Sequence, residues 1–124
     1  MLSEGTVFAT VAVKDINSAK KFYGDTLGLK QTDENPGGVT YTSGSGKIFV
    51  YQSQTAGSGQ ATCAAWEVKD VPAEVEALKS KGVTFEKYDL PDTIWEGEVA
   101  SMGPMQAAWF NDPDGNILNV VSGM

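Results

Sequence analysis

The chain contains one short pattern twice, and this repeat limits its possible folds more than any other feature. Residues 12–16 read AVKDI and residues 67–71 read EVKDV. Each copy ends a run rich in β-forming residues, 6–13 and 61–68, and is followed by apolar residues at helical spacing. Both copies therefore mark a strand-to-helix junction, and the sequence predicts two copies of one structural unit.

The aspartate of each junction is expected to cap the helix that follows it. A carboxylate at this position accepts hydrogen bonds from the free backbone N–H groups of the first helical turn, which favours a structural role for Asp15 and Asp70 over a catalytic one. We expect the two helices to stop at Gly28 and Gly82. The apolar positions expected inside the first helix are Ile16, Ala19, Phe22 and Tyr23.

Three short segments with β-strand character follow each helix. In the first half of the chain they are expected at 29–33, 39–42 and 47–51, and in the second half at 83–88, 105–110 and 116–121. Each half is thus a βαβββ unit, and the fold class is α+β. We expect one domain over 1–124, with unit one at about 4–53, a Ser/Gly/Gln-rich connector at about 54–60 and unit two at about 61–123.

The second unit contains two features that the first lacks. Residues 112–116 read DPDGN, which fits a type I turn with a glycine bulge, because a calcium-binding EF-hand loop needs its glycine later and a glutamate at its end. This hairpin pairs Asp112 with Asn116 and places Trp109 opposite Asn119. Residues 89–104 are expected to form a long internal loop that carries Trp95 among acidic side chains.

Charge and composition exclude several classes of function. The 9 basic residues are all lysines, against 16 acidic ones, so the net charge is −7 and the chain has neither arginine nor histidine. Histidine-based triads and histidine-ligated zinc are therefore excluded, as is the bidentate arginine fork that binds phosphate. Nucleic acid and acidic membrane surfaces are poor partners for such a chain, and a neutral or cationic small molecule fits better.

The remaining composition points to a cytoplasmic location. Cys63 is the one cysteine, so no internal disulfide forms. The first residues lack the basic start and long apolar run of a signal peptide, and no stretch reaches the roughly 20 apolar residues that cross a bilayer. We expect a cytoplasmic protein without a membrane partner.

Together these motifs resemble the vicinal oxygen chelate superfamily, which contains glyoxalases, bleomycin resistance proteins and extradiol dioxygenases. The resemblance rests on the two junctions, on Phe22-Tyr23 followed by LGL at 27–29, and on the DPDGN hairpin, and it spans about residues 6–121. It implies a U-shaped, incomplete barrel with the helices outside and a ligand cavity inside. It also implies a homodimer.

The resemblance also identifies where a metal would be held. Enzymes of this superfamily take one ligand from the first strand and one from the last strand of each unit, and the matching positions are Phe8, Val50, Cys63 and Asn119. Phenylalanine and valine have no donor atom, neutral asparagine is a poor anchor, and one thiol makes no site for a hard cation. We therefore expect no metal and no cofactor.

Strand alternation predicts the ligand-binding wall of the cavity. We expect the ligand to contact Phe8, Thr10, Thr40, Val50, Cys63, Trp95, Ala107, Trp109, Ile117 and Asn119. The same alternation adds Ala12, Ile48, Ala65, Glu67 and Val121. Three alternatives stay open: Phe8 and Trp109 fill the barrel as core, Trp95 is a lid or a dimer anchor, and Cys63 is a small buried hydrophobe rather than a nucleophile.

Three functions are compatible with these residues. The first is a metal-independent binding protein for a cationic or aromatic compound, similar to the bleomycin resistance proteins, with the acidic residues around Trp95 as its rim. The second is a glyoxalase-like lyase, isomerase or dioxygenase in which Glu67, Glu96 or a tyrosine works as acid or base. The third is a non-catalytic dimeric module. The sequence assigns no catalytic residue.

Overall fold

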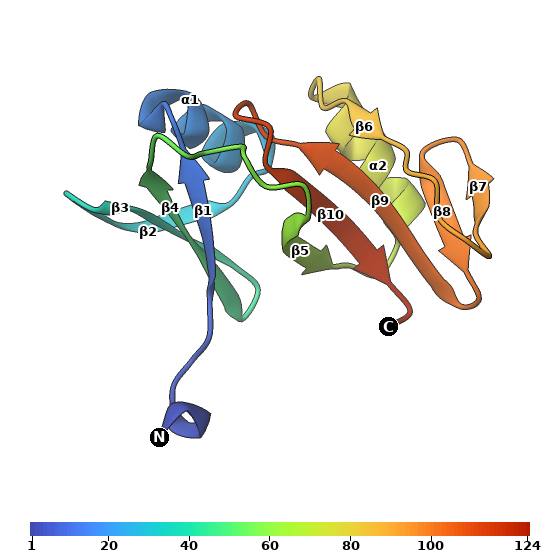
Figure 1. Ribbon diagram of the computed structural model, residues 1–124, viewed down its shortest axis with the longest axis horizontal. Coiled ribbons are helices and arrows are strands. Elements are labelled where there is room, and N and C mark those ends of the chain that lie inside the picture. Colours follow the sequence, from blue (N-terminus) through green and yellow to red (C-terminus); the bar gives the residue numbers. More distant parts are fainter.

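The computed structural model describes residues 1–124 and contains two sheets that lie side by side without closing into a barrel (Figure 1). The first sheet has the strand order β1-β4-β3-β2, with β1 parallel to β4 and the other pairs antiparallel. Its strands are β1 (Ala9–Val13), β2 (Lys30–Asn35), β3 (Gly38–Ser43) and β4 (Gly46–Gln52). The sequence prediction of a βαβββ unit is confirmed for this half.

The second sheet repeats this arrangement and adds strands at its outer edge. Its order is β5-β10-β9-β8-β7, with β5 parallel to β10, while β6 pairs with another part of β9. The strands are β5 (Thr62–Glu67), β6 (Phe85–Glu86), β7 (Ile94–Glu96), β8 (Val99–Met102), β9 (Met105–Asn111) and β10 (Ile117–Ser122). The predicted α+β class with two related units and an open barrel is therefore correct.

Helices cover one face of each sheet. In unit one, α1 (Ile16–Lys20) continues directly into the π-helical turn η2 (Lys21–Thr26), and in unit two α2 (Val71–Ser80) packs on β9 and β10. A short 3₁₀ turn, η1 (Leu2–Glu4), lies away from both sheets (Figure 1). No helix in the structure has the length and apolar character needed to cross a membrane.

Both predicted helix caps are present. The Asp15 carboxylate accepts hydrogen bonds from the backbone N–H groups of Asn17 and Ser18 at 2.9 and 3.3 Å, and these bonds lower the pKa of Asp15. The Asp70 carboxylate accepts from the N–H of Ala73 at 3.0 Å. The junction aspartates thus stabilise helix ends, which is the role that the sequence favoured.

The expectation of a long loop at 89–104 is wrong, because this segment contains the β7–β8 hairpin. Trp95 pairs with Ala100, and β8 continues through a turn at Gly103 into β9. The hairpin forms because Val99 and Ala100 are buried against the rest of the sheet, at 7% and 0% exposure. The many glycines and acidic residues in the segment hide this short apolar stretch from a reading of periodicity alone.

A buried hydrogen bond joins the two units. The hydroxyl of Tyr23 in η2 donates to Asp112 Oδ2 at 2.8 Å, and Asp112 lies in the turn between β9 and β10. Asp112 also accepts from the N–H groups of Asp114 and Asn116, both at 2.9 Å. The Asn116 amide donates to the carbonyl of Ala12 in β1 at 2.7 Å. The DPDGN turn therefore docks unit two onto the helix and first strand of unit one.

The turn itself has the predicted form. The Asp112 N–H donates to the Asn116 carbonyl at 3.1 Å, the Gly115 N–H donates to the Asp112 carbonyl at 3.0 Å, and Gly115 has φ of 88°. The left-handed conformation favours glycine at this position. The predicted pairing of Trp109 with Asn119 follows from this turn and is confirmed.

Because the hydroxyl of Tyr23 is buried against Asp112, we expect the protein to lose stability at alkaline pH. Burial, and then the adjacent Asp112 carboxylate, raise the pKa of Tyr23 far above its usual value of about 10. Above about pH 10 the unfolded chain loses this proton while the folded chain keeps it, so stability is complete below that pH and falls above it. The pKa values of Tyr41 and Cys63 are also raised, mainly by burial. Both groups therefore also lower the stability of the folded protein as the pH rises.

The variant Tyr23→Phe isolates the contribution of Tyr23 to this pH dependence. We expect its unfolding free energy to fall less steeply above about pH 10, by up to about 1.4 kcal/mol per pH unit. Urea unfolding between about pH 8 and about pH 11 measures the two slopes. Equal slopes for both proteins would show that Tyr23 is not protected from ionisation in the folded state.

Candidate functional site

The candidate site lies on the face of the second sheet opposite α2. Side chains that are register partners on neighbouring strands share a face, so Ala65, Asn119 and Trp109 form one row across β5, β10 and β9. A second row on the same face runs through Glu67, Val121, Ala107, Ala100 and Trp95. Alternation thus brings two tryptophans and one amide to the same side of the sheet.

The rings of Tyr88 and Trp95 pack against the ring of Trp109. The Tyr88 ring meets it edge to face, with the ring centroids 5.8 Å apart and an angle of 88° between the planes. The Trp95 ring lies 6.2 Å away at 50°, and the Lys87 ammonium lies over the Trp95 ring at 5.5 Å. The Trp109 indole N–H donates to the Thr62 hydroxyl at 3.2 Å, which fixes the orientation of the central ring.

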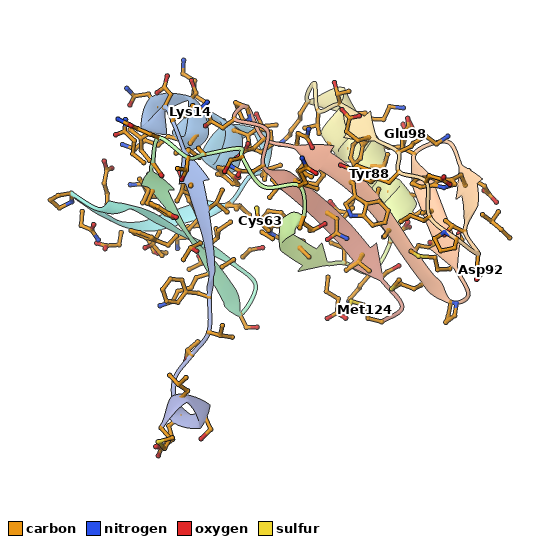
Figure 2. The ribbon with its side chains drawn as sticks, viewed as in Figure 1. Lys14, Cys63, Tyr88, Asp92, Glu98 and Met124 are labelled. Carbon is orange, nitrogen blue, oxygen red and sulfur yellow. The ribbon has the colours of Figure 1, made fainter.

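A hollow of about 270 Å³ lies beside these rings. Figure 2 labels Cys63 beside β5 and Tyr88 beside β9. The surface of the hollow is mainly apolar, with two polar side chains at its edge. Its lining consists of Gln60, Ala61, Thr62, Tyr88, Leu90, Trp109 and Ile117. Such a surface binds a flat or apolar group by contact and stacking.

Asn119 carries an unsatisfied hydrogen-bond acceptor on this face. Its Oδ1 atom is buried and has no hydrogen-bond donor, although nearly all buried polar atoms in proteins are paired. Its register partner is Trp109, the centre of the aromatic cluster. An unpaired buried acceptor costs about 1–3 kcal/mol, and a ligand that supplies an N–H or O–H group recovers part of that cost.

The first sheet presents its own, separate set of candidate residues. Thr10, Phe49 and Thr40 are register partners and form one row across β1, β4 and β3. Phe8 precedes β1 and remains 45% exposed, with the Lys47 ammonium 5.2 Å from its ring centroid. It therefore does not fill the barrel as core. These residues lie on a different sheet from the Trp109 cluster.

The placement of Val50 and Ile48 on the cavity wall is wrong. Val50 is completely buried between its register partners Val11 and Val39, in the core under the helices, and Ile48 is 4% exposed. Phe49 takes the wall position instead. The β3–β4 turn has two residues, with Ser43 paired to Gly46, while the DPDGN hairpin has one residue more. This difference of one residue changes the parity of β4, that is, which of its alternate side chains face the wall and which face the core.

Two other predicted site residues differ from expectation. Ala107 is only 1% exposed, so it forms the floor under the row and offers a ligand no accessible surface. Cys63 lies at an irregularity in the pairing of β5 with β10 and is exposed rather than a small buried hydrophobe. Partial desolvation and the Asp112 carboxylate raise the pKa of the Cys63 thiol, which lowers its reactivity as a nucleophile.

The residues at the superfamily's ligand positions do not fit a divalent metal. With the parity of β4 corrected, these residues are Phe8, Phe49, Cys63 and Asn119. Two have no donor atom, and one thiol with one neutral amide makes no site for a hard divalent cation. The structure contains no cluster of three or more histidine, cysteine, aspartate or glutamate side chains that could hold a metal.

Two βαβββ units with open sheets, joined through a DPDGN turn, define the glyoxalase-type class of fold. The family model of the Glyoxalase/Bleomycin resistance protein/Dioxygenase superfamily matches residues 6–120, and the chain belongs to this superfamily.

Solved structures share the fold at low sequence identity. FosX, a fosfomycin resistance protein from Listeria monocytogenes, has a TM-score of 0.72 at 15% identity over 98% of this chain and 94% of its own. Lactoylglutathione lyase from Agrobacterium tumefaciens has a TM-score of 0.68 at 17% identity over 96% and 94%. An integron cassette protein from V. cholerae has a TM-score of 0.67 at 21% identity over 100% of both chains.

Sequence reasoning missed several residues of this face. Tyr88 was missed although the strand expected at 83–88 contains it: Glu86 is a register partner of Trp109, and the strand ends at Glu86, two residues before Tyr88. Thr62 was missed because Cys63 has no partner in β10, so that Thr62 pairs with Ile117 and plain alternation along β5 does not hold at its start. The signal for Phe49 was present in the length of the β3–β4 turn, which fixes the parity of β4.

Proposed function

We propose that this chain is a metal-independent small-molecule binding protein that holds a cationic or aromatic compound on the exposed face of its second sheet. The observation that carries the proposal is the hollow lined by Tyr88 and Trp109, with Trp95 packed against Trp109 and the unpaired Asn119 oxygen on the same face. Aromatic faces attract cations, and the acceptor favours a ligand with an N–H group.

The charge of the protein supports a cationic ligand. The net charge is −7, and the segment that surrounds Trp95 contributes Asp89, Asp92 and Glu96, for which the structure records no ion pair. Glu98 is different, because it binds Lys79 at 2.6 Å and is therefore neutralised. Figure 2 shows Asp92 and Glu98 toward opposite ends of the β7–β8 hairpin, so the acidic rim is uneven.

The two units are packed together within one chain. We propose that residues 1–124 act as one domain, because the hydrogen bond between Tyr23 and Asp112 makes the two units one packed structure. We also propose a cytoplasmic homodimer, on the resemblance to the superfamily. The site residues in this proposal are those of the second sheet, namely Thr62, Cys63, Tyr88, Trp95, Trp109, Ile117 and Asn119. The expected residues Phe8, Thr10 and Thr40 lie on the first sheet together with Phe49, and they are not part of it.

Calorimetric titration with acridine orange, a cationic aromatic dye, tests the proposal. We expect saturable binding that weakens by about 10- to 30-fold in Trp109→Ala, since stacking and cation–π contact at one such ring contribute about 1.4–2 kcal/mol. Phe8→Ala removes an exposed aromatic residue from the other sheet and is the matched control. Equal affinity in Trp109→Ala and wild type, or no binding across a panel of cationic aromatic compounds, would contradict the proposed site.

A glyoxalase-like enzyme is the second candidate. The neighbours include a protein named as a lyase, and Glu67 lies on the same face as Val121 and Ala107. A carboxylate there could act as a general base or hold an unusual metal. Elemental analysis of protein purified without chelator separates the candidates, because near-stoichiometric metal would favour the enzyme over the binding protein.

A non-catalytic dimeric module is the third candidate. It requires that the hollow beside Trp109 has no ligand at all. A failed dye panel together with a dimeric mass in sedimentation would favour this candidate.

A further inference from the structure

A second hollow, of about 180 Å³, lies on the helix side of the sheets, where unit one meets unit two. Seven of its nine lining residues are hydrophobic. It shares no residue with the hollow beside Trp109. We call it the inter-unit slot, and its lining residues are Leu27, Leu29, Ser43, Trp66, Val68, Glu74, Leu78, Phe110 and Val120.

The repeat explains why the slot exists. Val11 and Val50 of unit one are register partners, as are Trp66 and Val120 of unit two, so these pairs occupy equivalent places in the two sheets. The unit-one pair is at most 1% exposed, whereas in unit two Val120 is 4% exposed and Trp66 is only half-buried. The slot therefore leaves Trp66 partly uncovered, while its unit-one counterpart Val11 is covered.

The helices show the same difference. Tyr23 and Leu78 each stand eight residues after a capping aspartate, and Ala19 and Glu74 each stand four residues after it. Tyr23 and Ala19 are at most 1% exposed. Leu78 is half-buried and Glu74 is exposed, and both line the slot.

The two turns cause this asymmetry. The DPDGN turn covers α1 and η2, with Asp112 bonded to Tyr23. The equivalent turn of unit one is the shorter sequence SGSG at 43–46, which has no aspartate, proline or asparagine to fill the space over α2. Ser43, at the place of Asp112, and Leu78, at the place of Tyr23, make no hydrogen bond to each other in the structure. The short turn thus leaves an open apolar slot.

We propose that the inter-unit slot is a second ligand site, and that it takes a small organic ammonium compound with one aromatic ring or a short alkyl chain. The rings of Trp66 and Phe110 are stacked, with their centroids 6.2 Å apart, and form an apolar wall. Dry apolar cavities of about 150 Å³ bind molecules the size of benzene, so the volume fits one ring. Glu74 is the one charged residue of the lining and has no ion pair, and its carboxylate complements the ammonium group.

Titration of the full chain with phenethylammonium, followed by ¹H–¹⁵N NMR, tests the proposal. We expect saturable shifts of the amides of Val68, Leu78 and Val120. The neutral isostere 2-phenylethanol should bind about three- to tenfold more weakly, because it cannot pair with Glu74. Glu74→Gln should weaken phenethylammonium by the same factor and leave 2-phenylethanol unchanged.

Two variants distinguish this site from the proposed function. Ser43→Phe places a ring at the mouth of the slot and should abolish the shifts, with Ser45→Phe in the same turn as the folding control. Trp109→Ala removes the centre of the other site and should leave the shifts unchanged. The proposal fails if the probe shifts only residues near Trp109, if Glu74→Gln has no effect, or if the slot amides shift with protein concentration alone, which would identify a second copy of the chain as the occupant.

Discussion

Replacing Asp112 by alanine is expected to lower the free energy of unfolding by about 3 kcal/mol and the melting temperature by about 10 °C. The carboxylate is only 5% exposed. It accepts hydrogen bonds from the hydroxyl of Tyr23, from two backbone N–H groups of its own turn and from the Asn116 side-chain amide. Alanine leaves these four donor groups without this acceptor in a site that is largely closed to water, and an unsatisfied buried donor costs far more than an intact bond contributes.

Thermal and urea unfolding of Asp112→Ala measure this effect, with Asp25→Ala as the matched control. Asp25 is exposed, and the structure records no hydrogen bond to its carboxylate, so its removal should change stability by less than about 0.5 kcal/mol. Tyr23→Phe should cost less than Asp112→Ala, because it removes only the one bond. A double-mutant cycle between the two residues should give a coupling of about 1 kcal/mol or more. Additive effects would show that they do not interact.

Phe110→Ala is expected to destabilise the protein by about 4 kcal/mol, the largest effect of any single truncation considered. Phe110 is 1% exposed and contacts aromatic residues from both units. Its ring lies 5.5 Å from Phe85, 6.2 Å from Trp66 and 6.5 Å from Phe22. Truncation removes the apolar surface that the ring buries and leaves a cavity that connects with the inter-unit slot. Because the neighbouring side chains cannot fill this cavity, the full cost of the lost contacts remains.

Phe8→Ala makes the same chemical change at a ring that is 45% exposed and should cost less than about 1 kcal/mol. Chemical denaturation of both variants compares them directly. If Phe110→Ala unfolds at the same denaturant concentration as Phe8→Ala, Phe110 does not hold the two units together. Because the truncation enlarges the slot, phenethylammonium should also stabilise Phe110→Ala if the variant still folds.

The elements that depend on neighbours in sequence could be predicted without coordinates. Asp15 and Asp70 cap helices because a carboxylate meets the N–H groups two or three residues later, which no distant contact alters. The DPDGN turn fixes the register of β9 and β10 for the same reason, and with it the pairing of Trp109 with Asn119. The pairing of Trp109 with Asn119 in the candidate site could therefore be predicted from the sequence.

The incorrect predictions concern short segments whose sequence is compatible with two structures. A turn that is shorter by one residue reverses the parity of β4, and this moved Val50 from the expected wall into the core. The β7–β8 hairpin was missed because its strands are short and its apolar residues few. Tyr88 lies on an irregular segment, where only packing against Trp109 decides its position.

The repeat, the capping residues and the turn sequence determined the fold class, the two units and their superfamily, because each acts through local geometry that recurs in both halves. The absence of histidine likewise excluded any histidine-ligated metal. Only the tertiary structure decided how the units meet. The joint at Asp112, the aromatic cluster at Trp109 and the inter-unit slot all depend on residues far apart in the chain, whose contacts arise from packing rather than from spacing.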